Sequence, residues 1–485
     1  MPAVRSALLP SAALAASALL LAGSLSAQTT PTERTAAGAV LATIDSLQAA
    51  LGPARMADRL AQAKDPERDK LLARVAALWE AEFQGLGDWI GKHPEVGWKE
   101  LRAVDTLVRL LRKNGFTVDT GVAGLPTAFT ATWESPVGSG GPVLGLIAEY
   151  DALRGTSGAF HGDQHNAQSP VAMAAALALK EYLTGKRLPG VIKVFGTPAE
   201  EVGPPAKSIM RDAGIFTGTS ILVRSHSSSE TARSNAGFGI CCLNINEVKY
   251  IFTGRPSHQL SSWNGRNALE AAVHFYLAVD GLRSSLRPEA SIQGVIPEGG
   301  IAPNVVPDRA VVDYYIRYPD GVYLEHISQM MDNAAKAAAL ATGTEVEIDR
   351  YGEYRDGIAL GTLEEIYFSY ARSLGAPRLV AERQRPAGYE ETGGVSLDVP
   401  GVGVSVASST FPNHTMGMLE DAFTTTGHAG FRMDAQIMAA VLYHYLTDAG
   451  FRQSVATEHL ALKGLYQRYQ ENLRKAYAAE LTPQD

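Results

Sequence analysis

Residues 143–166 carry a dense group of side chains that can bind a metal ion. An apolar run, Val143–Ala148, is typical of a buried strand. Five potential metal ligands follow it closely: Glu149, Asp151, His161, Asp163 and His165. Open α/β sheets bind their ligands at the carboxyl ends of their strands, and a helix-like segment, Ser169–Leu183, comes next. Taken alone, the spacing also fits a solvated polar loop.

A second cluster downstream favours the metal site. The sequence GTPAEE places Glu200 and Glu201 directly after a predicted strand, where successive side chains point to opposite sides. One carboxylate could therefore bind a metal while the other faces a reacting water. Carboxylates mixed with imidazoles suit two divalent ions bridged by a carboxylate, and the remaining members of such a set are Asp163, His165, His226 and His414.

This donor set indicates amide hydrolysis. Two ions that share a carboxylate lower the pKa of a bound water and polarise a carbonyl group. The free carboxylate beside them can take the proton of the water and pass it to the leaving nitrogen. Alone, the pair Glu200–Glu201 would also fit a charged surface turn, so the prediction depends on the whole set.

The elements that must position these residues predict an α/β fold. Apolar strand-like runs alternate with helix-like segments in a βαβ rhythm, which implies a sheet that is at least partly parallel. The strands are expected at 128–133, 143–148, 190–196 and 220–224, and helices at 169–183 and 206–213. Apolar residues also recur at helical spacing in 75–89 and 99–114, and Gly115 supplies a stop.

A different pattern interrupts this domain from about Glu247. Its order is β-α-β-β-α-β, which is that of a ferredoxin-like unit. The expected elements are strand 248–253, helix 267–282, strands 291–296 and 310–318, helix 323–341 and strand 345–351. Apolar strands and helical periodicity resume from Leu363, and the charged tail after Phe451 is expected to form a helix packed on the surface.

Composition excludes several classes of function. The chain has 485 residues and is 46% hydrophobic, so it can bury a sizeable core, in more than one domain. A net charge of −8 without a long Lys/Arg run gives no electrostatic footprint for nucleic acid. The two cysteines, Cys241 and Cys242, are neighbours and therefore poorly placed for a disulfide, so we expect them to be buried strand residues.

The first 27 residues have the layout of a cleaved secretory signal. Arg5 precedes an apolar run, Ala7–Ala22, and small residues follow it. The alternative is a membrane anchor, but the run is short and no stop-transfer pattern follows. We therefore expect an exported protein, periplasmic or secreted, that does not stay inserted in the membrane after the signal is removed.

Several motifs in order resemble the M20 metallopeptidase family, in particular its amidohydrolase branch, close to the aminobenzoyl-glutamate hydrolase type. The resemblance covers roughly residues 70 to 450. The matching stretches are HPEVGWKE (His93–Glu100), AEYDAL (Ala148–Leu153), HGDQHN (His161–Asn166), GTPAEE (Gly196–Glu201), GRPSHQ with GRNALEAA (Gly254–Ala272), GGIAPNVVPDRAVVDYYIR (Gly299–Arg317) and PNHTM (Pro412–Met416).

The resemblance implies roles for individual residues of the large domain. Glu200 would be the general base, and Asp151 would orient or support the metal site. His161 would support the ligands without being one, and His428 would be a helix-start residue. The implied ligands of two divalent ions, Zn²⁺ or Mn²⁺, are Asp163, His165, Glu201, His226 and His414.

It also implies roles in the small domain. His258 and Asn304 would help to hold the oxyanion and the substrate, and Arg317 would bind a substrate carboxylate. The alternatives are a capping or surface histidine, a turn residue before Pro307 and an edge-strand charge, respectively. The small domain would pair two chains into a homodimer, with His258 reaching the site of the neighbouring protomer.

The chain departs from the branch at two places. Asp163-Gln164-His165 stands where the branch usually has Cys-Gly-His, so a bridging carboxylate would replace a thiolate and change the metal preference. Relatives commonly read GSTDVGDVS where this chain has GYEETGGVS, Gly388–Ser396, a segment that lies near the site in the family. The first change bears on metal binding, and the second bears on substrate specificity.

The sequence thus predicts an exported amidohydrolase with six segments. These are a signal peptide (1–27), a linker and helix (28–74), a catalytic domain in two parts (75–246 and 359–450), an inserted lid and dimerisation domain (247–358) and a helical tail (451–485). The expected substrate is a small N-acyl or N-aminoacyl amino acid, such as an aminobenzoyl-glutamate-like compound. The alternatives are a dipeptidase or aminopeptidase of the same family and a binding protein with impaired catalysis.

Overall fold

The computed structural model describes residues 30–232, 239–241, 243–380 and 393–481. Its larger domain is built on a six-stranded sheet in the order β1-β2-β6-β3-β7-β16. The strands from β6 to β16 are parallel, and β1 and β2 are antiparallel additions. Their bounds are β1 Thr117–Thr120, β2 Phe129–Glu134, β3 Val143–Ala148, β6 Val191–Gly196, β7 Ile221–Ser225 and β16 Gly401–Val404. The predicted α/β class is confirmed.

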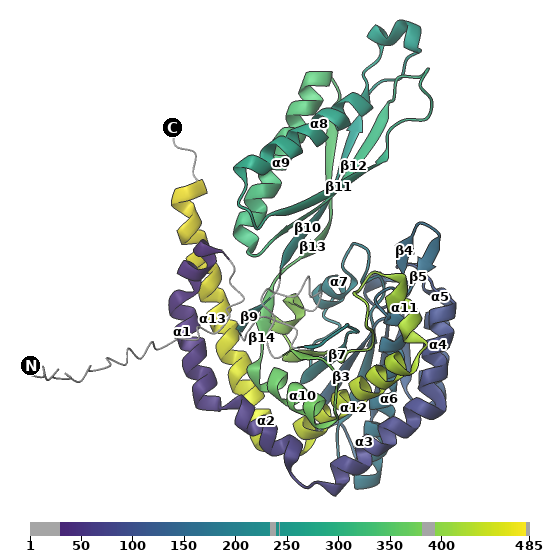
Figure 1. The fold of residues 1–485 in the computed structure, drawn as a ribbon, viewed down its shortest axis with the longest axis vertical. Helices are drawn as coiled ribbons and strands as arrows, with labels where there is room; N and C mark the ends of the chain where they lie inside the picture. Colours follow the sequence, from purple (N-terminus) through teal and green to yellow (C-terminus); the bar gives the residue numbers. More distant parts are fainter. Residues whose placement is uncertain (1–29, 233–238, 242, 381–392, 482–485) are drawn as a thin grey trace, which may run out of the picture.

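Helices cover this sheet and form the rim of the larger domain (Figure 1). The Ala-rich helix α6, His165–Lys186, is buried along its first fifteen residues, 165–179, because α3, α4 and α12 pack around it. Small side chains let these helices approach closely. The remaining helices of this domain are α3 Pro66–Leu78, α4 Gln84–Lys92, α5 Leu101–Lys113, α7 Ala206–Asp212, α10 Gly361–Ser373, α11 Met416–Ala422 and α12 Thr425–Thr447.

The segment expected as one helix at 75–89 is interrupted. Between α3 and α4 the backbone forms a π-helical turn, Trp79–Phe83, in which both aromatic side chains are buried. A π-helical turn inserts a residue into the helical repeat, which hydrophobic periodicity does not reveal. The stop predicted at the end of α5 is confirmed, since Gly115 adopts φ +80°.

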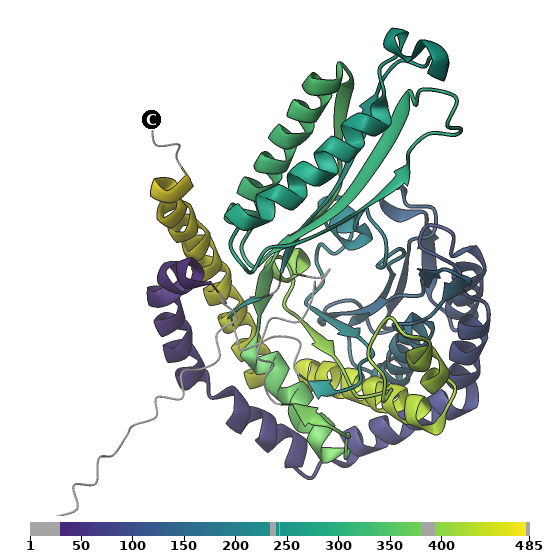
Figure 2. The same ribbon diagram turned by 45° about the horizontal axis from the view of Figure 1, so that its top comes forward.

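The smaller domain is a four-stranded antiparallel sheet with two helices on one face (Figure 2). Its strand order, β11-β12-β10-β13, is that of a ferredoxin-like unit. The elements are β10 Asn244–Thr253, α8 Ala268–Leu282, β11 Ser291–Glu298, β12 Arg309–Tyr318, α9 Gly321–Thr342 and β13 Glu345–Tyr354. The short pair β9 (Gly239–Cys241) and β14 (Gly357–Ala359) connects it to the larger domain.

Helices from the two ends of the chain pack side by side (Figure 1). They are α1 Pro31–Leu51 and α13 Ala449–Leu481, with α2 Pro53–Gln62 leading from α1 to the larger domain. The hydroxyl of Tyr477 donates to Asp320 at 2.7 Å, so α13 also reaches the smaller domain. No helix within the described ranges combines the length and apolar character needed to cross a membrane. The expected signal, 1–27, lies outside these ranges.

Short strand pairs complete the larger domain around its carboxyl edge. They are the hairpin β4 Leu153–Gly155 with β5 Gly158–Phe160, and the parallel pair β8 Thr231–Ala232 with β15 Leu379–Val380. The hairpin lies between Asp151 and His161, so it separates the first acidic residues after β3 from the start of α6. The loop that contains residues 381–392 falls outside the described residues, and so does most of the GYEETGGVS segment.

Candidate metal centre

The carboxyl ends of four neighbouring strands bring the expected metal ligands together. Asp151 follows β3, Glu200 and Glu201 follow β6, and His226 follows β7 directly. His414 lies in the loop after β16. These strands are adjacent in the order β6-β3-β7-β16, so residues scattered over more than 260 positions of the sequence converge at one edge.

Three residues at this edge have backbones in the left-handed region, which non-glycine residues rarely adopt. They are Gln164 (φ +58°), Ala199 (φ +55°) and His414 (φ +65°). Gln164 precedes His165, the first residue of α6, and its amide is held by Met418 at 2.6 Å and Ser408 at 2.7 Å. Such strain persists only where surrounding contacts enforce it, and it gathers at functional sites.

Among the described residues, three overlapping sets of side chains offer ligand atoms within 4.8 Å of one another. Asp163 belongs to two of these sets, and Glu201 and His165 also belong to two each. The sets are Asp163–His165–His226, Asp163–Glu201–His414 and His165–Glu200–Glu201. An arrangement in which one carboxylate belongs to two histidine-containing sets fits a pair of divalent ions.

The two adjacent glutamates occupy different positions in this arrangement. Glu201 lies between two imidazoles, with Oε1 3.9 Å from His165 Nε2 and Oε2 3.7 Å from His414 Nε2. Glu200 lies 4.0 Å from the same His165 nitrogen, and its other oxygen lies 4.0 Å from Arg224. Glu201 therefore lies between two of the histidines, whereas Glu200 lies near only one of them.

Hydrogen bonds orient the imidazoles so that a second nitrogen faces the cluster. The Nδ1 of His165 lies 3.0 Å from Asp151, and the Nδ1 of His226 lies 2.8 Å from the carbonyl oxygen of Ser227. In both rings Nε2 then carries the lone pair that binds a metal. Asp151 also accepts the backbone N–H of Glu201 at 2.9 Å, so one buried carboxylate fixes two of the expected ligands.

The electrostatics of the cluster fit a bound cation. Burial raises the pKa of Glu201 to about 10, helped by the carboxylates of Glu200 and Asp163 and opposed by His165. Burial also opposes ionisation of Asp163, but the hydrogen bond from His414 at 2.9 Å and the charges of the surrounding histidines together lower its pKa. Asp163 Oδ1 is buried without a hydrogen-bond partner among the described residues. Crowded buried carboxylates with an orphaned oxygen are what divalent cations neutralise.

A buried ion cluster lies behind the site, and its cations were not predicted. Glu149, a potential ligand in sequence, forms ion pairs with Lys207 and with Arg224, the latter at 3.2 Å. Burial opposes ionisation of Glu149, but these cations lower its pKa. The cations come from α7 and β7, and no spacing in the sequence links them to Glu149. Glu149 therefore has a structural role in its ion pairs with α7 and β7, and it lies outside the three donor sets of the described residues.

The other predicted histidines of the larger domain do not belong to the donor sets found among the described residues. His161 is buried, and burial lowers its pKa to about 3, so it stays neutral there. His428 lies in the first turn of α12 and pairs with Asp88 at 2.9 Å. The position of His428 agrees with the helix-start placement expected from the sequence, and the supporting role of His161 stays a prediction.

The three residues of the small domain that were expected at the site lie in two different regions of that domain. His258 and Asn304 are exposed neighbours, joined by a hydrogen bond from Gln259 N–H to the Asn304 carbonyl at 3.1 Å. His258 lies in the loop between β10 and α8, and Asn304 lies in the loop between β11 and β12. Both loops are at the tip of the small domain, away from the catalytic sheet (Figure 1). Arg317 is on β12, an inner strand between β10 and β11, so the alternative of an edge-strand charge is wrong.

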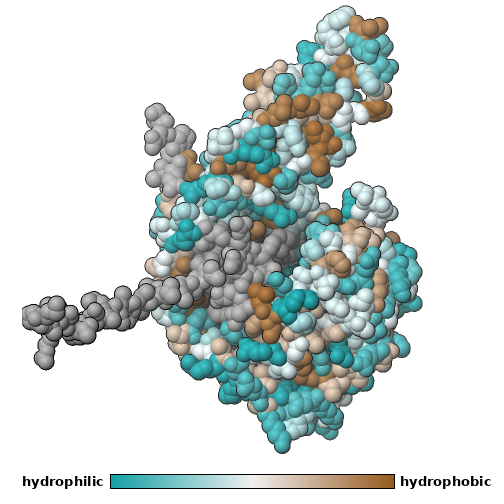
Figure 3. Space-filling view, viewed as in Figure 1, coloured by the Kyte–Doolittle hydropathy of each residue, from teal (hydrophilic) through white to brown (hydrophobic). Residues whose placement is uncertain are grey.

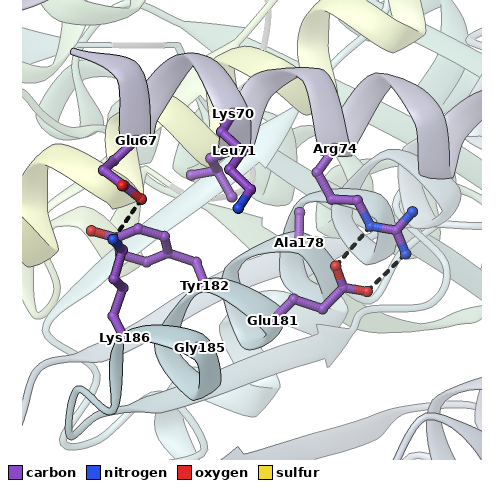
Figure 4. A pocket seen from close by; sticks show the side chains of 9 residues that line it. All are labelled: Glu67, Lys70, Leu71, Arg74, Ala178, Glu181, Tyr182, Gly185 and Lys186. Atoms are coloured by element: carbon purple, nitrogen blue, oxygen red, sulfur yellow. Dashed lines mark hydrogen bonds and ion pairs between the residues drawn. The ribbon is translucent and has the colours of Figure 1, made fainter.

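A separate surface groove lies between α3 and α6 (Figure 4). Two ion pairs frame it, Glu67 with Lys186 and Arg74 with Glu181, both at 2.7 Å, and Lys70 lies between them. Each carboxylate already has a cationic partner, and exposed pairs of this kind contribute little energy. The groove therefore offers no second site of the kind found at the sheet edge.

The fold and the donor sets together define a metal-dependent hydrolase, and comparisons with known proteins identify its family. Residues 236–342 match the M20 peptidase dimerisation domain. The chain is 32% identical over 356 residues to the mouse Xaa-Arg dipeptidase, covering 71% of this chain and 78% of the relative. It is 28% identical over 449 residues to a p-aminobenzoyl-glutamate hydrolase component of Escherichia coli K12, covering 78% and 92%. The chain belongs to the M20 family.

Solved structures share the fold. The aminobenzoyl-glutamate utilization protein of Klebsiella pneumoniae superposes with a TM-score of 0.56 at 17% identity, covering 78% of this chain and 99% of that one. A dinuclear metal-binding peptidase of the M20 family from Bacillus subtilis gives 0.51 at 18% identity, covering 76% and 99%. The relatives support an amidohydrolase or dipeptidase that acts on amide bonds. The donor sets of the described residues fit divalent metals.

Proposed function

We propose that this chain is an exported two-metal amidohydrolase that cleaves the amide bond of an N-acyl or N-aminoacyl amino acid. The observation that carries the proposal is the sharing of Asp163 between two donor sets, with Glu200 beside them. Asp163 would bridge the two ions, with His165 and His226 on one side and Glu201 and His414 on the other. Oxygen and imidazole donors suit Zn²⁺ or Mn²⁺.

The residues around the metals divide the chemistry between them. The ions, when bound, would lower the pKa of a water and polarise the scissile carbonyl. Glu200 would accept the proton of that water and deliver it to the leaving nitrogen, because it lies beside the cluster near one histidine and, unlike Glu201, is not placed between two. Asp151 would keep His165 in the tautomer that presents Nε2.

A panel assay with metal analysis tests this function. The protein would be purified without its first 27 residues, its metal content measured, and hydrolysis followed for N-acyl amino acids, aminobenzoyl-glutamate and dipeptides. We expect two metals per chain and turnover of at least one N-acyl or N-aminoacyl amino acid. Tight metal binding without turnover of any substrate would instead support a binding protein.

A dipeptidase is the second candidate, favoured by the relatives named Xaa-Arg dipeptidase at 31% and 32% identity. Both candidates use the same site and break the same kind of bond. They differ in the group on the carbonyl side, since a dipeptide has a free α-amino group there. Dipeptides ending in arginine, each compared with its N-acetylated form, therefore separate them.

Arg317 is proposed to bind the carboxylate of the substrate. A charge-assisted pair is lost in Arg317→Ala, so kcat/KM should fall far more for substrates with a free carboxylate than for their amidated analogues. Each substrate and its amide would be measured with both proteins, and Arg309→Ala, on the same strand but paired with Glu298 at 2.9 Å, is a matched control. Equal losses for both substrates would indicate a structural arginine.

The bridging role of Asp163 predicts a change in metal stoichiometry. Asp163→Ala should lower the content from two metals to one or none, because both ions lose a shared ligand. Asp163→Cys should restore binding with a softer metal preference, since thiolate is the softer donor. Metal analysis after dialysis against a weak chelator measures this. An alanine variant that keeps two tightly bound metals and full activity would contradict the bridge.

The small domain is proposed to pair two chains. Its match to a dimerisation domain is supported by large apolar side chains exposed on α8 and β11. Figure 3 shows apolar residues gathered over the small domain. The exposed residues on these two elements are Val273, Tyr276, Leu277, Val295 and Ile296. An isologous contact through this face would form a closed two-fold dimer.

A further inference from the structure

The loop that carries Glu200 and Glu201 is held between the two domains. It runs from the end of β6 to the start of α7. On the side of the larger domain, Glu100 accepts the backbone N–H of Ala199 at 2.8 Å, and Trp98 Nε1 donates to the Gly203 carbonyl at 3.4 Å. Because Ala199 has a left-handed backbone, these contacts fix the direction in which the next two side chains leave the loop.

On the side of the small domain, Glu247 of β10 closes over the same loop. Its side chain is almost fully buried, with 3% exposed, and its Oε2 has no hydrogen-bond partner among the described residues. A β-carbon built on Gly203 would overlap this oxygen, and so would one built on Gly352 of β13. The carboxyl group therefore fits into a notch formed by one glycine from each domain.

The β-strand register shows how the notch arises. A register shift between β10 and β13 occurs at Glu247 and Val248, next to Gly352. Glu247 pairs with Gly352 and Val248 pairs with Arg350, so the extra residue of the bulge is Tyr351 of β13. The bulge therefore lies in β13 and leaves Gly352 opposite Glu247, where the glycine makes room for the carboxyl group. The contact is thus built into the backbone of both domains and needs no flexible surface side chain.

We propose that Glu247 is a positioning residue: seated between Gly203 and Gly352, it sets the loop that presents Glu200 and Glu201, so that the placement of the small domain controls the reactive pair. This rests on the proposed roles of Glu200 as base and Glu201 as metal ligand. Gly203 is two residues from Glu201, so a displacement of the loop there moves both side chains. A misplacement of about 1 Å at a reacting centre can cost on the order of a hundredfold in rate.

Burial makes the contact of Glu247 dependent on pH, and the polar groups around its carboxyl group modify the effect. On β12 it faces Tyr315, Asp313 and Arg317, and on β13 it faces Tyr354 and Tyr351. Lys249 of its own strand lies over the Tyr351 ring at 4.1 Å, and Tyr351 donates to Asp313 at 2.8 Å. On the loop itself, the nearest titratable groups along the chain are Glu200 and Glu201.

Burial raises the pKa of Glu247 from its ordinary 4.5 to about 7 in this arrangement. The hydrogen bonds from Tyr315 and Tyr354 work in the opposite direction. When the loop and the small domain separate, the carboxyl group becomes hydrated and returns towards its ordinary pKa. The contact is therefore most favourable below about pH 4.5 and is lost as the pH rises through about 7.

A double-mutant cycle across the domain boundary tests the proposal. Gly203→Ala should lower kcat by about a hundredfold, because the new β-carbon displaces the loop against Glu247. Glu247→Ala removes the obstructing carboxyl group and should cost less. The double variant should recover most of the activity that Gly203→Ala loses, because only the Tyr351 ring, 2.8 Å from the added β-carbon, then remains close. Such recovery is a non-additive result expected only for residues in contact. Additive losses would overturn the proposal.

Two further readouts separate positioning from a general structural role. Glu247→Gln keeps the shape of the side chain but cannot ionise, so it should retain activity. In the wild type, ionisation of Glu247 should lower kcat as the pH rises through about 7, and this decline should be absent in Glu247→Gln. Hydrogen exchange in the peptide 197–205 should be faster in Glu247→Ala. Glu347→Gln, an exposed carboxylate on β13, is the matched control and should change neither.

The exchange measurement also keeps this inference apart from the proposed function. If no substrate is hydrolysed by the wild type, the function is wrong, but faster exchange in Glu247→Ala still supports the contact. If hydrolysis occurs and exchange of the loop is the same in Glu247→Ala and wild type, the positioning role is wrong. Metal content and melting temperature of Gly203→Ala, compared with the double variant, identify loss of folding as the cause of a defect.

Discussion

Glu200→Gln is expected to keep its metals and lose most of its turnover. The neutral amide occupies the same space but cannot accept the proton of the attacking water. General base catalysis typically contributes about 10²–10⁴-fold in rate, and kcat should fall by an amount in that range. Metal binding should survive because Glu200 lies near only one imidazole of the cluster, at 4.0 Å, whereas Glu201 lies near two.

The adjacent residue supplies the matched control. Glu201→Gln changes the same chemical group one position along the chain, at a carboxylate that lies between His165 and His414. We expect this variant to lose metal as well as activity. Metal analysis and single-turnover kinetics on both variants distinguish the roles. If Glu200→Gln loses both metals, Glu200 is a ligand, and the base must be sought elsewhere.

Features of this site could be predicted from the sequence where the residues that determine them lie within one short stretch of the chain. The sequence predicts the strand Val143–Ala148 with the bounds it has, because an unbroken apolar run between polar residues is a local pattern. The order β-α-β-β-α-β is likewise a succession of local patterns, and it leads to the correct fold. The expected ligands come from motifs within short stretches, and the structure brings all of them to one sheet edge.

The features that sequence reasoning missed depend on contacts between distant residues. Lys207 and Arg224 are buried against Glu149, yet a single lysine or arginine in sequence is normally a surface residue. In the sequence Glu247 marks only the start of the small domain, although its carboxyl group reaches the loop of the reactive pair. In each of these contacts the two partners are more than forty residues apart in the sequence, so no short stretch of the chain contains both of them.

The terminal helices show the same limit. The sequence predicts a surface-packed helix after Phe451, and α13 is a helix, but it also joins the domains. Its Glu458 accepts the backbone N–H of Thr362 at 2.9 Å in the larger domain, while Tyr477 reaches Asp320 in the smaller one. Arg287 of the small domain donates a hydrogen bond to Thr32 at 2.8 Å, so the first residues of α1 also contact this domain. Helical periodicity predicts which face of α13 is buried, but it does not predict which elements of the two domains pack against that face.

Mixing two inactive variants is expected to restore activity, because the site is proposed to be completed by a second chain. His258 lies at the exposed tip of the small domain, where its imidazole accepts the Leu260 N–H at 3.2 Å, and not in the cluster of its own chain. In a two-fold dimer through α8 and β11 this tip would reach the neighbouring sheet edge. One donor lost from an oxyanion site costs on the order of 10²–10³-fold, so His258→Ala alone should be nearly inactive.

The arithmetic of the mixture makes the test quantitative. If each site takes Glu200 from one chain and His258 from the other, a heterodimer of Glu200→Gln and His258→Ala has one site with both defects and one intact site. At equal mixing half of the dimers are heterodimers, so activity should return to about a quarter of wild type. Exchange of chains between dimers would be verified with two affinity tags. Exchange without recovery would place His258 in the site of its own chain or outside any site, as a residue that only caps the turn at Leu260.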